Sequence, residues 1–126
     1  MTAMTPGVLL QEARELMART DSATAGTWPR TSALLIRQAL EQAVRSHWAA
    51  LPETAGLASA SMRSQLTCLP FYLDATIAGQ VAYVWAALSR ACHYHPYELA
   101  PTGAELTGWI ADVESLITQV GVSVKG

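Results

Sequence analysis

Residues 90–97, Arg-Ala-Cys-His-Tyr-His-Pro-Tyr, bring together the side chains of this chain that are best suited to chemistry on a phosphate. Arg90 carries a permanent charge on a planar group that can bind two phosphate oxygens. His95 titrates near neutral pH and can give or take a proton. Because Pro96 disfavours helical geometry at His95, we expect Arg90 in the last turn of a helix and His95 in the segment that leaves it. Such a break would let the imidazole fold back towards the guanidinium, so the stretch predicts a phosphate site at a helix end.

Five helices are expected to position this stretch. Apolar residues recur every three or four positions, and residues that favour helix starts precede each run. The predicted helices run from Pro6 to Arg19 or Thr20, from Pro29 or Thr31 to about Trp48, from a cap at Ser59 or Ser61 through Leu69, from the cap Asp74 to about Ala91, and from a capping box at Thr102–Glu105 to a stop at Gly121.

The helix that ends at the motif has two different faces. One stripe is large and apolar, with Val81 and Leu88, and the other is small, with Gly79 and Ala86. A helix that is apolar or small nearly all round is packed on more than one side. The small stripe therefore predicts close approach by another helix, either inside the bundle or across a dimer seam.

The fold class follows from these elements. The chain shows no strand alternation, no repeat of 20 to 50 residues and no low-complexity linker. Mostly short connections between helices predict an all-α antiparallel bundle of four long helices plus one short helix. We expect one domain over 1–126, with frayed ends at 1–4 and 122–126.

Composition adds an expectation about assembly. Hydrophobic residues make up 51% of the chain and charged residues 14%, against roughly 25% charged in ordinary globular domains. So few charges leave little to coat the surface of a monomer, which predicts a homodimer. The net charge of −2 gives no support to broad nucleic-acid binding, so any contact with nucleic acid would be local.

No apolar run approaches the roughly 18 residues needed to span a bilayer, and the first residues lack the pattern of a signal peptide. Cys68 and Cys92 form no spaced metal motif and are expected to be free thiols. We therefore expect a cytoplasmic protein without a membrane contact or a cofactor.

Arg90, His95 and Tyr97 form the pattern Arg-x4-His-x-Tyr, which lies after one long helix and before the last one. In this motif and in its all-helical layout, the chain resembles the HEPN family of small ribonuclease and toxin domains. The resemblance implies a homodimer in which the arginines and histidines of two chains face one cleft and cut RNA without a metal. Arg90 and His95 would be the catalytic pair.

The resemblance also implies partners. Tyr97 matches the tyrosine that a nucleotidyltransferase partner modifies with AMP in some paired toxin systems, so a nucleotidyltransferase-type or other antitoxin protein is expected beside RNA. The family often has a polar residue such as asparagine after the arginine, where this chain has Ala91. That departure bears on catalysis more than on the fold.

RNA cleavage through the 2′-hydroxyl needs a base, an acid for the leaving 5′-oxygen, and positive charge on the phosphate. One histidine does not readily serve as both acid and base, so two copies of His95 across a two-fold axis would meet the need. His93 could be a second titratable group, or it could stack on the helix end.

Three other interpretations compete with catalysis. In the first, Arg90 binds helix-end carbonyls and the motif is only structural. In the second, His93, His95 and Glu98 hold a metal, although no third ligand stands at a familiar spacing. In the third, the bundle is a non-catalytic dimerisation module or binds a regulator or antitoxin.

Elsewhere, Glu41 and its neighbouring arginines predict a solvated helix face, and His47 is assigned no catalytic role.

Overall fold

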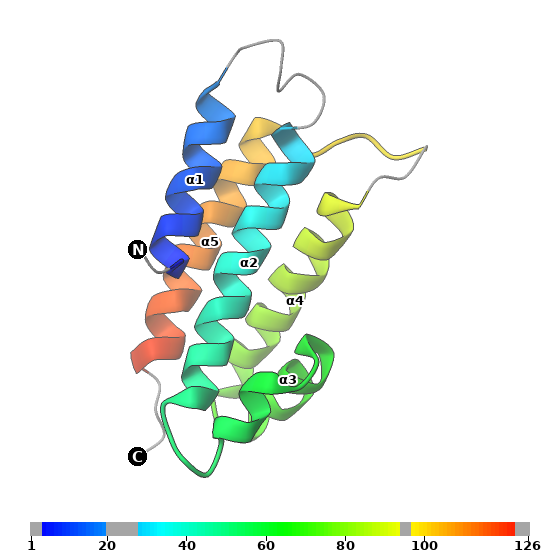
Figure 1. The fold of residues 1–126 in the computed structure, drawn as a ribbon. Helices are drawn as coiled ribbons and strands as arrows, with labels where there is room; N and C mark the ends of the chain where they lie inside the picture. Colours follow the sequence, from blue (N-terminus) through cyan, green and yellow to red (C-terminus); the bar gives the residue numbers. More distant parts are fainter. Residues whose placement is uncertain (1–3, 20–27, 94–96, 123–126) are drawn as a thin grey trace.

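The computed structural model describes residues 4–19, 28–93 and 97–122. These ranges contain no strand, and the prediction of an all-α bundle is confirmed (Figure 1). The α-helices are α1 (Pro6–Ala18), α2 (Trp28–Ala49), α3 (Met62–Cys68), α4 (Ala75–Cys92) and α5 (Gly103–Val122), with short 3-10 helices at Ala55–Ser59 and Leu69–Phe71. Four of the α-helices are long and α3 is short, as predicted.

Four helices begin at side-chain caps. A side-chain oxygen before each helix accepts an amide hydrogen that has no partner within the first turn. Thr5, Ser61, Asp74 and Thr102 accept from the amides of Val8, Ser64, Thr76 and Glu105 at 3.2, 3.1, 2.9 and 3.1 Å. The Glu105 carboxylate returns to the amide of Thr102 at 3.0 Å, which completes the capping box.

Two predicted helix ends are shifted. The helix that starts after Ser61 ends at Cys68, and a 3-10 helix with Pro70 in its first turn follows it directly. The last helix passes through Gly121 to Val122, so this glycine does not stop it. Most of the ends expected to be frayed, together with residues 21–27 between the first two helices, lie outside the described residues.

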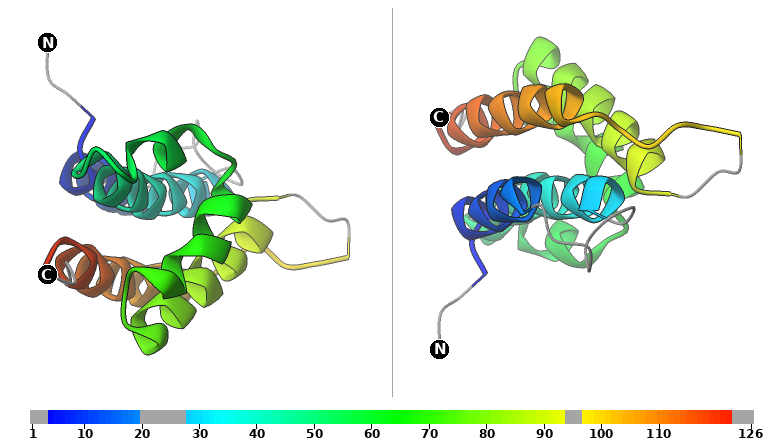
Figure 2. Two further views of the ribbon diagram at one scale, coloured as in Figure 1. Left: turned by 90° about the horizontal axis from the view of Figure 1, so that it is seen from below. Right: turned by 90° about the horizontal axis from the view of Figure 1, so that it is seen from above.

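Helix α2 lies at the centre of the bundle. It packs against α1 on one side and α4 on the other, and α5 covers a third side (Figures 1 and 2). Each helix runs antiparallel to the next long one, so α2 and α5 run in the same direction. The largest fully buried side chains come mainly from α2, α4 and α5 and include Trp48, Ile36, Leu40, Leu88 and Leu106.

The two faces of α4 have different surroundings. Val81 and Leu88 of the large apolar stripe are buried in the core. Gly79 and Ala86 of the small stripe are exposed, and an added Cβ at Gly79 would meet no atom within 4 Å. Ala82 and Ser89, which belong to the same stripe, are half-buried, so the small stripe lies partly against the bundle and partly at its surface.

Across the described parts of the chain, none of the helices combines the length and apolarity required to cross a bilayer.

Candidate functional site

Arg90 lies in the last turn of α4, as predicted, with its side chain 75% exposed. Its Nη2 lies 2.6 Å from Oε1 of Glu98, which belongs to the segment returning towards α5. The hydrogen bond and the charge of Glu98 raise the pKa of Arg90 further above its usual value. The guanidinium is therefore a permanent, solvent-accessible cation at a helix end.

A shallow hollow of about 240 Å³ lies beside this ion pair. Its walls come from α2, α4, α5 and the return segment, and they include Arg30, Arg90, Glu98, Leu99 and Trp109. Leu99 is 96% exposed. The hollow thus combines two cations, the two carboxylates of Glu98 and Glu105, and apolar surface in a space open to solvent.

Arg30, in the first turn of α2, holds the end of α4. Its Nη1 donates to the carbonyl oxygens of Ala91, at 3.3 Å, and of His93. Its Nη2 donates to the carbonyl oxygen of Glu98 at 3.4 Å. The last carbonyls of a helix have no partner within the helix, so this guanidinium satisfies them and also ties the return segment to α2.

This arrangement separates the roles of the two arginines. One interpretation of the sequence had Arg90 binding the helix-end carbonyls. Arg30 does so instead, and the side-chain contact found for Arg90 within the described ranges is with Glu98. Sequence reasoning missed Arg30 because the groups it contacts lie more than sixty residues further along the chain.

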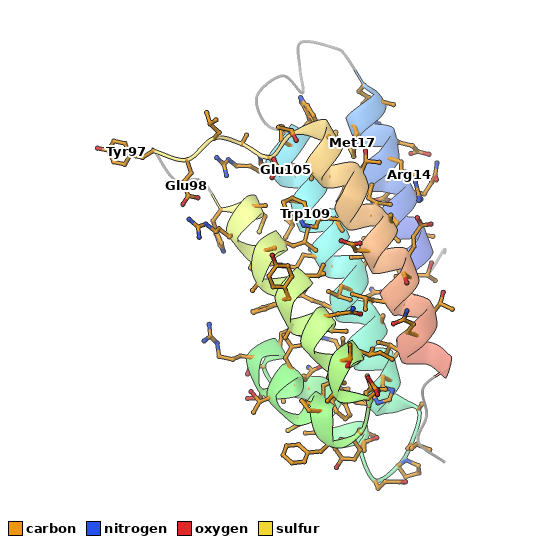
Figure 3. The ribbon with its side chains drawn as sticks, turned by 180° about the vertical axis from the view of Figure 1, so that it is seen from behind. Arg14, Met17, Tyr97, Glu98, Glu105 and Trp109 are labelled. Atoms are coloured by element: carbon orange, nitrogen blue, oxygen red, sulfur yellow. The ribbon has the colours of Figure 1, made fainter. Side chains whose placement is uncertain are left out.

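The structure describes His93 and Tyr97 of the motif but not His95. His93 is the exposed C-cap of α4, and its amide donates to the carbonyl of Arg90 at 3.4 Å. Tyr97 is fully exposed and projects away from the helices (Figure 3). His95 lies outside the described residues, so its expected approach to Arg90 stays a prediction, as does the metal site of His93, His95 and Glu98.

A second polar cluster joins α2 to α4 further along α2. Trp85 Nε1 donates to Glu41 Oε2 at 2.9 Å, and Arg37 Nε lies 3.7 Å from the same oxygen. Arg37 Nη1 also donates to Cys92 Sγ at 3.4 Å. The side chains of Arg37 and Glu41 are only 21% and 13% exposed, so the prediction of a solvated face is wrong here. Arg30, Arg37 and Glu41 are spaced so that they lie on one face of α2. This spacing was the signal in the sequence that the three side chains face the interior of the bundle.

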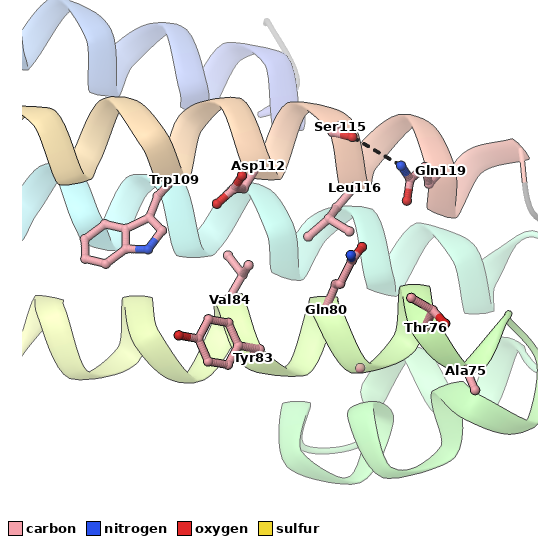
Figure 4. Close-up of a pocket in the computed structure, with 11 residues that line it drawn as sticks. Ala75, Thr76, Gln80, Tyr83, Val84, Trp109, Asp112, Ser115, Leu116 and Gln119 are labelled. Carbon is pink, nitrogen blue, oxygen red and sulfur yellow. Dashed lines mark hydrogen bonds between the residues drawn. The ribbon is translucent and has the colours of Figure 1, made fainter.

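A longer groove runs between α4 and α5. It encloses about 560 Å³, and Figure 4 shows Tyr83 on one wall with Trp109, Asp112 and Leu116 on the other. Trp109 also lines the hollow beside Arg90, so the two depressions adjoin one another. Asp112 is the charged residue among the side chains that line this groove.

Other titratable groups form no comparable site. No three histidine, cysteine or carboxylate side chains gather as a metal site in the part of the chain that the structure describes. His47 packs edge-on against Trp48, and burial lowers the pKa of its imidazole although a hydrogen bond to Val120 opposes the shift. The folded protein therefore favours neutral His47, not the cation that the end of α2 would suit.

Searches of known protein families, of curated proteins and of solved structures found no match to this chain.

Proposed function

We propose that this protein is a HEPN-like, metal-independent endoribonuclease or toxin domain that acts as a homodimer in the cytoplasm. Arg90 binds the scissile phosphate and His95 transfers protons. The observation that carries the proposal is the exposed guanidinium of Arg90 at the end of α4, which within the described residues is held by a surface ion pair with Glu98. Such pairs contribute little free energy, so a phosphate can displace the Glu98 carboxylate.

The anchoring by Arg30 supports the placement of the second group. Arg30 binds backbone oxygens at His93 and Glu98, on either side of the sequence position of His95. The proposal requires His95, which lies between these two positions in the sequence, to approach Arg90 at the end of α4.

The proposed reaction needs only protein side chains. One copy of His95 removes the proton from the 2′-hydroxyl, and the resulting oxyanion attacks phosphorus. Arg90 neutralises the added charge on the phosphate oxygens through two hydrogen bonds. The partner copy of His95 protonates the departing 5′-oxygen, which leaves a 2′,3′-cyclic phosphate and a 5′-hydroxyl. Tyr97, being fully exposed, is open to modification by a nucleotidyltransferase-type antitoxin.

The test is cleavage of a labelled single-stranded RNA with both product ends identified. His95→Ala should reduce the rate by about 10²–10⁴-fold, as expected for lost acid–base catalysis. Arg90→Lys should also slow cleavage because an ammonium cannot bridge two oxygens, whereas Tyr97→Phe should have a smaller effect. Cleavage should persist in EDTA. If the parent cuts no RNA while His95→Ala melts several degrees lower, the motif is structural and the proposal is wrong.

The ion pair provides a second arm of that experiment. Glu98→Gln removes the carboxylate that competes with phosphate for Arg90. The affinity for single-stranded RNA should rise by up to about five-fold, the equivalent of an exposed ion pair. Glu53→Gln makes the same change in charge at an exposed position between α2 and α3 and is the matched control. Equal affinities in both variants would mean that Arg90 does not bind phosphate.

A non-catalytic dimerisation or regulator-binding module is the second candidate. The observation that favours it is the exposure of Gly79, Tyr83 and Ala86 on the outer side of α4. In that case the protein assembles but leaves RNA intact.

A further inference from the structure

The groove between α4 and α5 and the hollow beside Arg90 adjoin one another but differ in charge. The hollow contains the guanidinium groups of Arg30 and Arg90 together with two carboxylates. Among the described residues that line the groove, none is basic and Asp112 is acidic. Trp109 forms part of both walls. A ligand that extends past Trp109 would therefore need an anionic end at Arg90 and a neutral end with hydrogen-bond donors in the groove.

The spacing along the two helices fits a single ligand of this kind. Tyr83 and Arg90 lie on one face of α4, separated by about two turns or about 10.5 Å along the axis. This separation is on the scale of one nucleotide, measured from its phosphate to the far edge of its base. The groove encloses about 560 Å³, which is within the usual size range of small-molecule pockets. A nucleotide is therefore the class of ligand that matches both depressions.

Two aromatic side chains on opposite walls provide surfaces for a base. Tyr83 stands on the α4 side and is 77% exposed, and half-buried Trp109 stands on the α5 side (Figure 4). Unstacked bases of single-stranded RNA commonly stack on aromatic side chains. The exposure of Tyr83 leaves its ring open to such a contact, so the groove is suited to a flat, aromatic ligand.

The carboxylate of Asp112 favours one base over the others. It points from α5 towards α4, and the ion pairs found among the described residues do not involve it (Figure 4). An ionised carboxylate offers two acceptor oxygens and no donor. Guanine presents two neighbouring donors, N1–H and the N2 amino group, on its Watson–Crick edge. Adenine and cytosine place an acceptor beside their amino group, and uracil has one donor between two acceptors. The carboxylate therefore matches guanine.

Gln80 can satisfy the remaining group on that edge of the base. It lies one turn before Tyr83 on α4, and its amide extends towards α5 in the same groove (Figure 4). A carboxamide carries two donors. One of them can bind O6 of guanine, the acceptor next to N1–H.

We propose that this groove binds a guanine base, and that the phosphate of the same nucleotide lies against Arg90. The base stacks between Tyr83 and Trp109, and Asp112 accepts hydrogen bonds from its N1–H and N2 amino group. The inference rests on the proposed function for the phosphate at Arg90 and adds the identity of the nucleotide bound there. The contacts with the base do not require RNA cleavage.

The experiment is calorimetric titration of the protein with guanosine, inosine and adenosine 3′-monophosphates. Inosine differs from guanosine only by the missing N2 amino group. It should bind at least about tenfold more weakly, the equivalent of one hydrogen bond to a charged group. Adenosine 3′-monophosphate should also bind more weakly than the guanosine nucleotide. Equal affinities for the three nucleotides, or no binding of any, would overturn the inference.

Asp112→Asn tests the carboxylate. An amide replaces one acceptor by a donor, so the preference for guanosine over inosine should disappear. Glu114→Gln makes the same change in charge on the same helix and is the matched control, because Glu114 pairs with Arg14 at 2.6 Å outside the groove. The preference should persist in this control. Equal losses in both variants would mean that Asp112 does not bind the base.

Tyr83→Ala tests stacking. It should weaken binding of all three nucleotides by roughly 5- to 100-fold, because stacking tolerates any base. Phe71→Ala removes an aromatic side chain that is 80% exposed and outside the groove, and it should leave the affinities unchanged. Thermal melts should show that both variants fold as the parent does, since both positions are exposed. Unchanged nucleotide affinity in Tyr83→Ala would overturn the stacking site.

The remaining outcomes separate this inference from the proposed function. A parent that prefers guanosine 3′-monophosphate but cuts no RNA supports the base site and contradicts the ribonuclease. A parent that cuts RNA without any preference for guanosine keeps the ribonuclease and overturns the base site. Arg90→Met should weaken binding of guanosine 3′-monophosphate by about five-fold or more, as expected for a lost charged contact. If it does not, the phosphate lies elsewhere and the single ligand spanning both depressions is wrong.

Discussion

At the scale of single residues, two arginines near the same helix end do different work. Arg30 is half-buried and its guanidinium binds the backbone oxygens of Ala91, His93 and Glu98, whereas Arg90 is exposed and pairs with the carboxylate of Glu98. Their local sequences do not reveal this difference, since each is a basic residue near a helix terminus. The difference arises from a tertiary contact between α2 and the end of α4, which no pattern within either segment records.

Replacing these arginines should separate their roles. Arg30→Met leaves the carbonyls at the end of α4 without a partner and should lower the free energy of unfolding by about 1.5–3 kcal/mol. Arg90→Met removes only an exposed ion pair and should lower it by less than about 1 kcal/mol. Urea unfolding of both variants at equal concentration measures this. If Arg90→Met is the more destabilising, the assignment of the clamp to Arg30 fails.

At the scale of helices, caps could be predicted and contacts between helices could not. Asp74 and the pair Thr102 and Glu105 act within one turn of chain, so their spacing alone specifies the helix starts. The faces of α2 were harder to assign. Glu41 has the spacing of a solvated ion pair, yet its partner Trp85 lies 44 positions away on α4.

The contribution of the contact between Glu41 and Trp85 to the free energy of unfolding can be measured by mutation. Glu41→Ala would leave Trp85 Nε1 without its acceptor and the half-buried Arg37 without the carboxylate it pairs with, and buried polar groups that lose their partners are costly. The free energy of unfolding should fall by about 1–3 kcal/mol. Gln38→Ala, at an exposed position one turn earlier on α2, is the control and should change it by less than about 0.5 kcal/mol. Equal effects would show that the α2–α4 cluster contributes nothing specific.

At the scale of the whole molecule, the all-α bundle was predictable because each long helix shows its own apolar period. The groove between α4 and α5 was not, because it depends on how far two helices lie apart. The candidate site likewise has one part that the sequence predicted and one part that it did not. The position of Arg90 at a helix end followed from Pro96, whereas its pairing with Glu98 required the path of the return segment.

The pH dependence of folding should report the contact between the ends of α2 and α5. Burial lowers the pKa of His47 in the folded state below the unfolded value of 6.5. Between these two pKa values the unfolded chain binds more protons, so stability is present above pH 6.5 and is lost as pH falls through the folded pKa. His47→Gln should reduce this slope. Urea titrations of parent and variant between about pH 5 and 7 measure the difference, and identical slopes would contradict it.

The polar line along α2 has a consequence for the alignment of the helices. Arg30, Arg37 and Glu41 each hold a different point of α4 or of the segment after it. Sliding α4 by one helical turn, about 5.4 Å, would separate all of these pairs at once. Apolar side chains alone would tolerate such a slip more readily, because leucine and valine stripes repeat along both helices. The contacts of these three side chains therefore fix one alignment of α4 along α2. That alignment sets the position of Arg90 relative to α2.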